Sequence, residues 1–179
     1  AFVAAGYRVV TDLSMRSEHS RALAERAGAT DLGSLDAVLD TAELLLSIVP
    51  PAQARTVAET VAGYGPIKGV YADCNAIAPA NAVALLTAVR NTGTTVLDVG
   101  IIGSPPARAG KRGTRFYVSG EARSLLLDLD VPGISFLDMG PEPGRASAIK
   151  MTYASLNKGV DALLTTVALS AMQLGVHEE

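Results

Sequence analysis

The runs ELLLSIVP (43–50), GVYADCN (69–75) and TTVLDVGII (94–102) decide the fold, because each is a short apolar stretch followed by turn-forming residues. Helical stretches separate them, the second of which runs from Pro79 to Arg90. Strands that alternate with helices in this way are typical of a parallel, doubly wound sheet. We therefore expect an α/β fold with right-handed crossovers.

Further elements extend the pattern on both sides. YRVVTDL (7–13) is a β-branched run, a charged helix follows over 18–27, and Ser34 is the expected N-cap of a short helix that reaches Asp40. Beyond residue 102 the order is a loop rich in Gly, Pro and Arg (103–113), a strand (114–120), a short helix (122–127) and a strand (134–140). These last strands are expected to complete the sheet.

The first six residues, AFVAAG, are typical of the last turns of a helix that ends at a glycine cap. A dinucleotide fold needs a Gly-rich turn between its first strand and first helix, and we expect that turn upstream of residue 1. The sequence thus predicts a Rossmann-like, mostly parallel sheet lacking its first strand. The alternative is an ordinary helix that opens another kind of α/β domain.

From Arg145 onward the sequence is compatible with one helix for more than thirty residues. An apolar helix of this length needs a surface to pack against. We therefore expect a cofactor-binding domain over 1–143 and, over 144–179, an interdomain helix that starts an all-helical C-terminal domain.

The composition excludes several classes of function. A formal charge of −3 gives no electrostatic basis for binding nucleic acid or an anionic membrane, and no apolar run is long enough to span a bilayer. Cys74 is the only cysteine, so no intramolecular disulfide can form, and a reducing cytoplasm is the expected location. Neither His19 nor His177 has the spacing of a metal ligand, so we expect no metal.

Two residues after the first predicted strand bear on the cofactor. Asp12 stands where an acidic residue would bind the adenosine ribose of NAD, whereas Arg16 is close enough to pair with the 2′-phosphate of NADP. The cluster of Ser14, Arg16 and Ser17 favours NADP. A solvated loop is an equally simple explanation, so the cofactor stays NADP or NAD.

The ends of the next strands predict the rest of the cofactor site. In a doubly wound sheet, ligands lie beyond the carboxyl ends of the strands, which here are Val49 with Pro50 and the segment 73–75 that ends in Asn75. Turn formation is the alternative role, because proline stops a strand and asparagine favours a turn. Cys74 is interpreted as a packing residue rather than a nucleophile, since no histidine base can be assigned to it.

Three segments, DVGIIGSPP (98–106), GTRFYVSG (113–120) and GRASAIKMTYASLNKG (144–159), resemble the β-hydroxyacid and 6-phosphogluconate dehydrogenases in order and spacing. The resemblance covers nearly the whole chain. It is greatest to 6-phosphogluconate dehydrogenase-like proteins whose C-terminal domain begins with such a helix. It implies that the first segment binds a substrate carboxylate, that the third carries a proton-transferring lysine, and that relatives form homodimers through the helical domain.

Carried over by residue, the resemblance makes Lys150 the acid/base and places Gly103 and Ser104 in the substrate loop. Oxidation of an alcohol needs a group that takes the hydroxyl proton, and desolvation can lower the pKa of a lysine into the useful range. From spacing alone, a lysine that extends into solvent is the simpler interpretation. The resemblance instead favours the acid/base role.

The sequence also departs from the family. Many relatives have asparagine one turn after the lysine, where this chain has Ala154, and Ile102 and Ser104 replace the usual loop serine and second glycine. Asn157 lies within about 20° of Lys150 around a helix, so we predict that it replaces the missing asparagine as a substrate contact. The alternative is an ordinary polar residue on the helix surface.

The resemblance therefore implies hydride transfer between NAD(P) and a small 3-hydroxy acid. If that acid is a sugar acid or is phosphorylated, Arg108, Lys111 or Arg112 would bind its second anionic group. One alternative is an imine reductase, because relatives of this shape also reduce C=N bonds. Another is a non-catalytic dinucleotide-binding protein, which the altered substrate motifs suggest.

Overall fold

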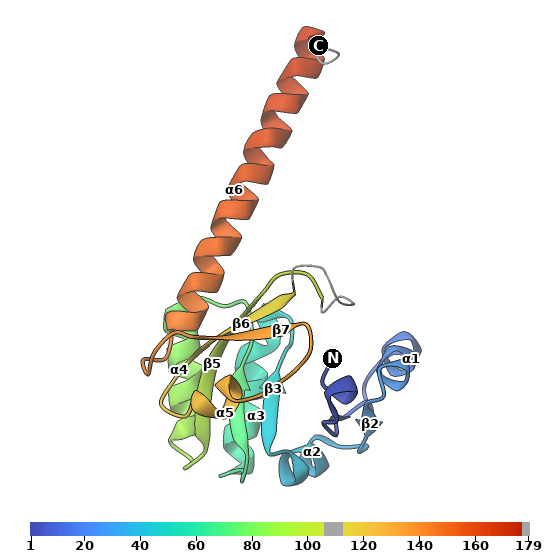
Figure 1. Cartoon of the computed structure of the whole chain (residues 1–179), viewed down its shortest axis with the longest axis vertical. Coiled ribbons are helices and arrows are strands. Elements are labelled where there is room, and N and C mark those ends of the chain that lie inside the picture. Colours follow the sequence, from blue (N-terminus) through green and yellow to red (C-terminus); the bar gives the residue numbers. More distant parts are fainter. Residues whose placement is uncertain (106–112, 177–179) are drawn as a thin grey trace.

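A five-stranded sheet forms the centre of the structure, a computed structural model that describes residues 1–105 and 113–176 (Figure 1). The strand order is β3-β4-β5-β6-β7, and only the β5–β6 pair is antiparallel. The strands are β3 (Leu44–Ser47), β4 (Val70–Asp73), β5 (Thr95–Ile102), β6 (Thr114–Ser119) and β7 (Ile134–Asp138). The expected α/β fold with a mostly parallel sheet is confirmed.

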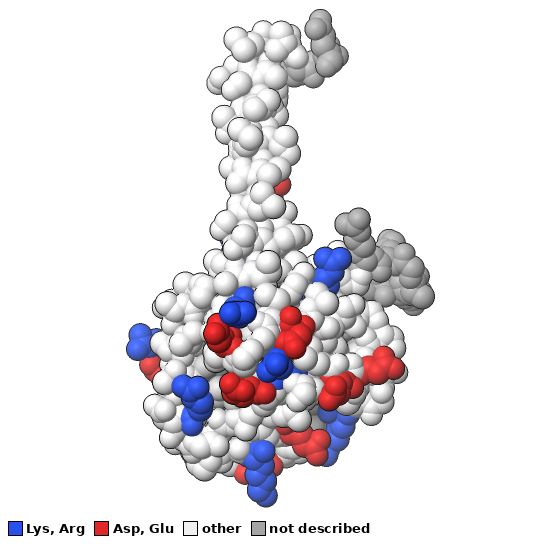
Figure 2. Space-filling view, turned by 60° about the vertical axis from the view of Figure 1, so that its left-hand side comes forward, with Lys and Arg blue, Asp and Glu red and all other residues white. Residues whose placement is uncertain are grey.

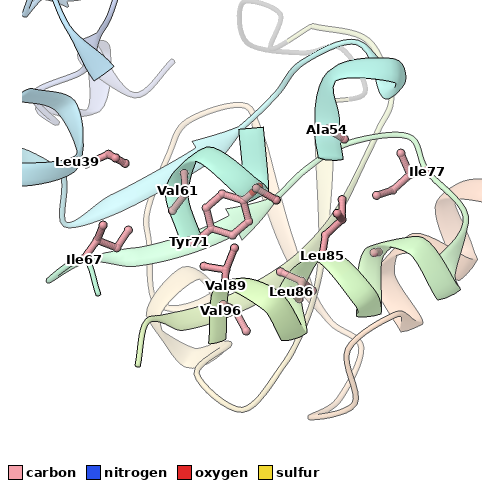
Figure 3. Packing of buried hydrophobic residues seen from close by; sticks show 12 residues of the cluster. Leu39, Ala54, Val61, Ile67, Tyr71, Ile77, Leu85, Leu86, Val89 and Val96 are labelled. Carbon is pink, nitrogen blue, oxygen red and sulfur yellow. The ribbon is translucent and has the colours of Figure 1, made fainter. Parts of the chain in front are cut away.

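One face of this sheet is covered by α3 (Ala54–Tyr64), which follows the short turn η2 (Pro51–Gln53), and by α4 (Pro79–Arg90). Figure 3 shows the fully buried ring of Tyr71, on β4, among side chains of both helices. Pro79 stands in the first turn of α4, as the sequence predicts. Strand β4, which pairs in parallel with both of its neighbours, is buried throughout, as expected for a strand of a parallel sheet.

The opposite face has its own apolar cluster, formed by side chains of β4 to β7 and by α5 (Ser124–Leu127). At the start of the chain, Phe2 precedes the 3₁₀ turn η1 (Val3–Ala5) and lies edge-on to Phe116, with 6.5 Å between ring centroids. Gly6 ends this turn with φ of 89°, in agreement with the predicted glycine cap.

A second, two-stranded sheet pairs β1 (Val10–Thr11) with β2 (Thr30–Asp31) in parallel through α1 (Glu18–Arg26). β2 is not anticipated by the sequence, and β1 is shorter than the predicted seven-residue run. A complete Rossmann sheet has the strand order 3-2-1-4-5-6 in its own numbering. Without the middle strand, number 1, such a sheet divides into a pair of strands and a separate larger set. These two parts correspond to the β1–β2 pair and the five-stranded sheet of this structure. The next helix, α2 (Leu35–Thr41), has the expected cap, since Ser34 Oγ accepts the Ala37 N–H at 3.2 Å.

The helix α6 (Arg145–Leu174) begins on the sheet and extends away from it (Figure 1). Its first turns are buried or half-buried, whereas residues 155–170 are exposed. On the face shown in Figure 2 the helix carries almost no charge, while charges of both signs are mixed over the body. None of the described helices is both long and apolar enough to cross a membrane. The exposed apolar side chains on α6 include Leu156, Val160, Leu163, Leu164, Val167, Leu169 and Met172.

Candidate active site

Four polar residues form a row across the large sheet. Ser47 on β3 pairs in register with Asp73 on β4, Asp73 pairs with Asp98 on β5, and Asp98 pairs with Ser119 on β6. All four side chains are buried, and the two aspartates have no exposed surface. Buried polar groups are costly without partners, so this row marks a place where the fold requires specific contacts.

Asp98 binds the first turn of α6. Its Oδ2 accepts the backbone N–H groups of Gly144 at 2.8 Å and Ser147 at 3.0 Å and the Ser119 hydroxyl at 3.0 Å. Its Oδ1 accepts the Ser147 hydroxyl at 2.6 Å. A helix N-terminus carries unpaired N–H groups and a partial positive charge, so a carboxylate there is well stabilised. Asp98 therefore joins α6 to the middle of the sheet.

Gly100 lets α6 approach β5 closely. A Cβ at this position would lie 2.5 Å from the Ala146 carbonyl oxygen and 3.2 Å from the Lys150 Cβ. Side chains of any size would push the helix away, so glycine is required by the close approach rather than by its backbone conformation. This contact places Lys150 directly over the sheet.

Lys150 directs its amine inward. Its Nζ donates to the Cys74 carbonyl at 3.0 Å, just beyond the carboxyl end of β4. Burial lowers the pKa of Lys150, while the nearby Cys74, Asp73 and Asp98 act in the opposite direction. The side chain is half-buried, so its position differs from that of a lysine extending freely into solvent.

Asn75 ties the ends of β3 and β4 together. Its Oδ1 accepts the Val49 N–H at 2.8 Å, and its Nδ2 donates to the Ser47 hydroxyl at 3.1 Å and to Asp73 Oδ1. The side chain is therefore bonded within the protein, and a cofactor beside it would meet the backbone and the neighbouring Val49 and Pro50. Pro50 is exposed and Val49 is half-buried.

Asp73 has an incompletely satisfied carboxyl group. Its Oδ2 is buried and has no hydrogen-bond partner among the described residues. Burial raises its pKa to about 6; the charge of Asp98 also raises it, whereas Asn75 and Lys150 lower it. The described residues contain no group of three or more His, Cys, Asp or Glu that could hold a metal ion.

Cys74 lies between these groups but is buried. Burial also raises the pKa of the Cys74 thiol, which keeps it protonated and poorly reactive. The sulfur contacts the Ala72 carbonyl at 3.6 Å. These features favour the interpretation of Cys74 as a packing residue.

The proposed substrate loop follows β5. Gly103 has φ of 116°, which glycine adopts readily, and the Ser104 carbonyl accepts the Thr114 hydroxyl at 2.6 Å. Both residues are exposed and line a mostly apolar cavity with Phe2 and Phe116. No hydrogen bond joins them to Lys150 within the described part of the chain. The basic residues Arg108, Lys111 and Arg112 lie outside the described residues.

Asp12 and Arg16 follow β1 in the small sheet. Asp12 Oδ1 accepts the Ser14 N–H at 2.9 Å. Hydrogen bonds from the Ser14 side chain and backbone lower the pKa of Asp12, and the charge of Arg16 contributes as well. Asp12 is thus an ionised carboxylate beyond the carboxyl end of its strand, and Arg16 is exposed nearby.

Asn157 lies two turns beyond Lys150 on the exposed part of α6. Its Nδ2 donates to the Tyr153 carbonyl at 3.0 Å, one turn back in the same helix. The structure thus brings Val49, Asn75 and Lys150 together but leaves Asn157 outside this group.

Sequence reasoning missed the roles of Asp98 and Ser147, although a signal was present. A charged residue in the middle of an apolar strand, as in VLDVG (96–100), predicts a buried carboxylate that must find donors. The identity of those donors did not follow, because Ser147 lies 49 residues away along the chain.

No family model matches the chain. An uncharacterized 28.5 kDa protein of Methanothermus fervidus, described by its position in the 5′ region of 7S RNA, is 27% identical over 171 residues, which is 96% of this chain and 64% of that protein. A conserved protein of unknown function, reported to be structurally similar to 3-hydroxyacid dehydrogenases, superposes with a TM-score of 0.76 at 30% identity. That match covers 99% of this chain and 66% of the other.

A third match is the imine reductase from Myxococcus stipitatus in complex with NADP⁺, with a TM-score of 0.73 and 20% identity over 98% of this chain and 61% of that one. The chain spans less than two thirds of the length of each of these three proteins. At 20% identity, the imine reductase shows a common fold only. In fold, the chain therefore groups with the 3-hydroxyacid dehydrogenase-like proteins, the superfamily that its motifs indicate.

Proposed function

We propose that this chain belongs to an NAD(P)-dependent oxidoreductase acting on a small 3-hydroxy acid. The observation that carries the proposal is Lys150, whose half-buried amine donates to the Cys74 carbonyl beyond the carboxyl end of β4. Doubly wound sheets bind dinucleotides at this edge, so the lysine lies where a cofactor and a substrate would meet.

The residues at the strand ends suit a dinucleotide. The ionised Asp12 carboxylate is a good acceptor for ribose hydroxyls, and Arg16 is a good partner for the 2′-phosphate of NADP. Val49, Pro50 and the backbone at Asn75 would flank the nicotinamide. The imine reductase that shares this fold was solved with NADP⁺, which supports NAD(P) here.

Lys150 would act as the general acid and base that transfers the hydroxyl proton. When bound, the nicotinamide accepts or supplies the hydride. In the oxidation direction the neutral Lys150 amine takes the hydroxyl proton, and the lowered pKa makes this neutral form more available. In the reduction direction the ammonium returns the proton while still donating to the Cys74 carbonyl. Gly103 and Ser104 would hold the substrate carboxylate, with Asn157 as a further substrate contact.

The exposed apolar side chains of α6 need a covering surface. We propose that residues 1–143 form the cofactor domain and that residues 144–179 begin a helical domain through which the protein forms a homodimer. A cytoplasmic location is part of the proposal, and the free cysteine Cys74 is compatible with a reducing compartment.

The test is the absorbance of reduced nicotinamide across a panel of 3-hydroxy acids, with NAD and NADP in turn, on the full-length gene product. Replacing Lys150 by Ala should lower kcat by about 10²–10⁴-fold, the usual contribution of a general acid/base. Lys158→Ala is the matched control, because Lys158 is exposed on the same helix. Equal activity of the Lys150 variant and the control would reject the assigned role.

Imine reduction is the second candidate, because an imine reductase shares the fold at a TM-score of 0.73. Adding cyclic imines to the panel separates the two reactions: turnover of imines alone would replace the hydroxy-acid proposal. Cofactor binding without turnover of either class would indicate a non-catalytic dinucleotide-binding protein, the third possibility that Ile102 and Ser104 suggest.

A further inference from the structure

We propose that Asp98 is a positioning residue: by binding the first turn of α6 to the sheet, it holds the Lys150 amine at the Cys74 carbonyl. The inference rests on the proposed function only in treating Lys150 as the proton-transfer group. The placement of Lys150 by Asp98 can be tested without any activity.

The first turn of α6 depends on strand residues for its capping. Gly144, at the N-cap, has no side chain to supply a bond to the helix. The N–H groups of Gly144 and Ser147 instead donate to Asp98, and the Ala146 N–H donates to the Ser119 hydroxyl at 3.2 Å. Three N–H groups that would otherwise lack partners are thus satisfied from β5 and β6.

The second step is the spacing between Ser147 and Lys150. Residues three apart in a helix lie on the same side, one turn above the other. Ser147 is 1% exposed and donates to Asp98 through both its N–H and its hydroxyl. Two hydrogen bonds to Asp98 therefore hold the helical turn that precedes Lys150.

The third step is the position of the strand partner. Asp98 lies in register with Asp73, and Cys74 follows Asp73 directly. The group that anchors the helix and the carbonyl that receives the lysine therefore sit on neighbouring strands. Gly100, two residues after Asp98, has no side chain that would keep the helix from this approach.

A cap that only stabilised the helix would leave the amine of Lys150 unaffected in the folded protein. A residue that places Lys150 would change the surroundings of that amine. The charge of Asp98 has an effect of its own, since its removal alone would lower the pKa of Lys150. Release of Lys150 from its buried position would raise that pKa, so the two effects have opposite signs.

The experiment is a pH titration by ¹³C NMR of the chain labelled at the lysine Cε atoms. The chain has four lysines, Lys68, Lys111, Lys150 and Lys158. The variants are Asp98→Asn, which removes the charge, and Ser147→Ala, which removes one bond without changing the charge. Ser155→Ala, at an exposed serine of the same helix, is the control.

We expect the Lys150 titration to move upward in Ser147→Ala and Asp98→Asn and to stay in place in Ser155→Ala. A downward shift in Asp98→Asn, with no shift in Ser147→Ala, would mean that Asp98 acts by charge alone and would overturn the inference. If Asp98→Asn does not fold, Ser147→Ala decides by itself.

The same variants are then assayed in the full-length protein. A lower kcat with an unchanged KM for the cofactor would extend the placement to catalysis. If no protein, including the unmodified one, has activity, the proposed function fails while the NMR result still decides the role of Asp98.

Discussion

Replacing Asp73 by Asn should stabilise the folded chain at neutral pH and have little effect in acid. The Asp73 carboxyl is fully buried, and its pKa is raised from 3.8 to about 6, mainly by burial. Between these two pH values the folded carboxyl keeps a proton that the unfolded one has lost. The contribution of Asp73 to stability is therefore most favourable below pH 4 and is lost as the pH rises towards 6.

The size of the effect follows from the two pKa values. At 1.36 kcal/mol for each pH unit, the interval from 3.8 to about 6 corresponds to about 3 kcal/mol lost at pH 7. An asparagine carries no charge and retains an oxygen that can accept from Asn75. Its amide must also be buried, so we expect a net gain of about 1–3 kcal/mol at pH 7.

The measurement is urea unfolding of both proteins at several pH values from 4 to 7.5. Asp130→Asn serves as the control, because Asp130 is exposed and such surface changes usually stay within about 0.5 kcal/mol. A variant that is less stable at pH 7, or a difference that does not depend on pH, would refute the reasoning.

Two further predictions concern packing. Gly100→Ala should cost about 1–3 kcal/mol in urea unfolding, because the new Cβ would lie 2.5 Å from the Ala146 carbonyl oxygen. Gly63→Ala, in an open position of α3, should instead gain about 0.5–1 kcal/mol, and equal effects at the two sites would contradict the close approach of α6. Cys74 should react with a thiol reagent only as fast as the chain unfolds, since its thiol is buried and protonated. Rapid labelling of the native chain would show that the segment after β4 opens.

Local sequence signals predicted most of the elements because those elements depend on local chemistry. Pro79 and Ser34 begin helices where the rules for first turns and caps place them. β2 was missed because two residues, Thr30 and Asp31, carry no periodic pattern, and their strand conformation depends on pairing with β1. The antiparallel direction of β6 likewise has no local signal in the sequence.

The site was predictable in outline only. The rule for strand ends brought Val49 and Asn75 to one edge, and the family resemblance added Lys150, which the structure places beside them. The hydrogen bonds from Val49 to Asn75 and from Ser119, Gly144 and Ser147 to Asp98 join residues 21 to 49 positions apart. Such partners are fixed by tertiary packing, so inspection of either segment alone does not identify them.

Because α6 is long and only its first turns are packed, small tilts about those turns move its far end by large distances. At 1.5 Å per residue its 30 residues extend about 45 Å, and only the first turns touch the sheet. Tilting the helix by ten degrees about Ser147 would move its far end by about 7 Å, while Lys150 would shift by less than about 1 Å. The same tilt would thus leave the Lys150 hydrogen bond nearly unchanged but would move Leu174 by the width of a side chain. A surface that packs on the distal half of α6 would therefore also restrict the position of the turn that holds Lys150.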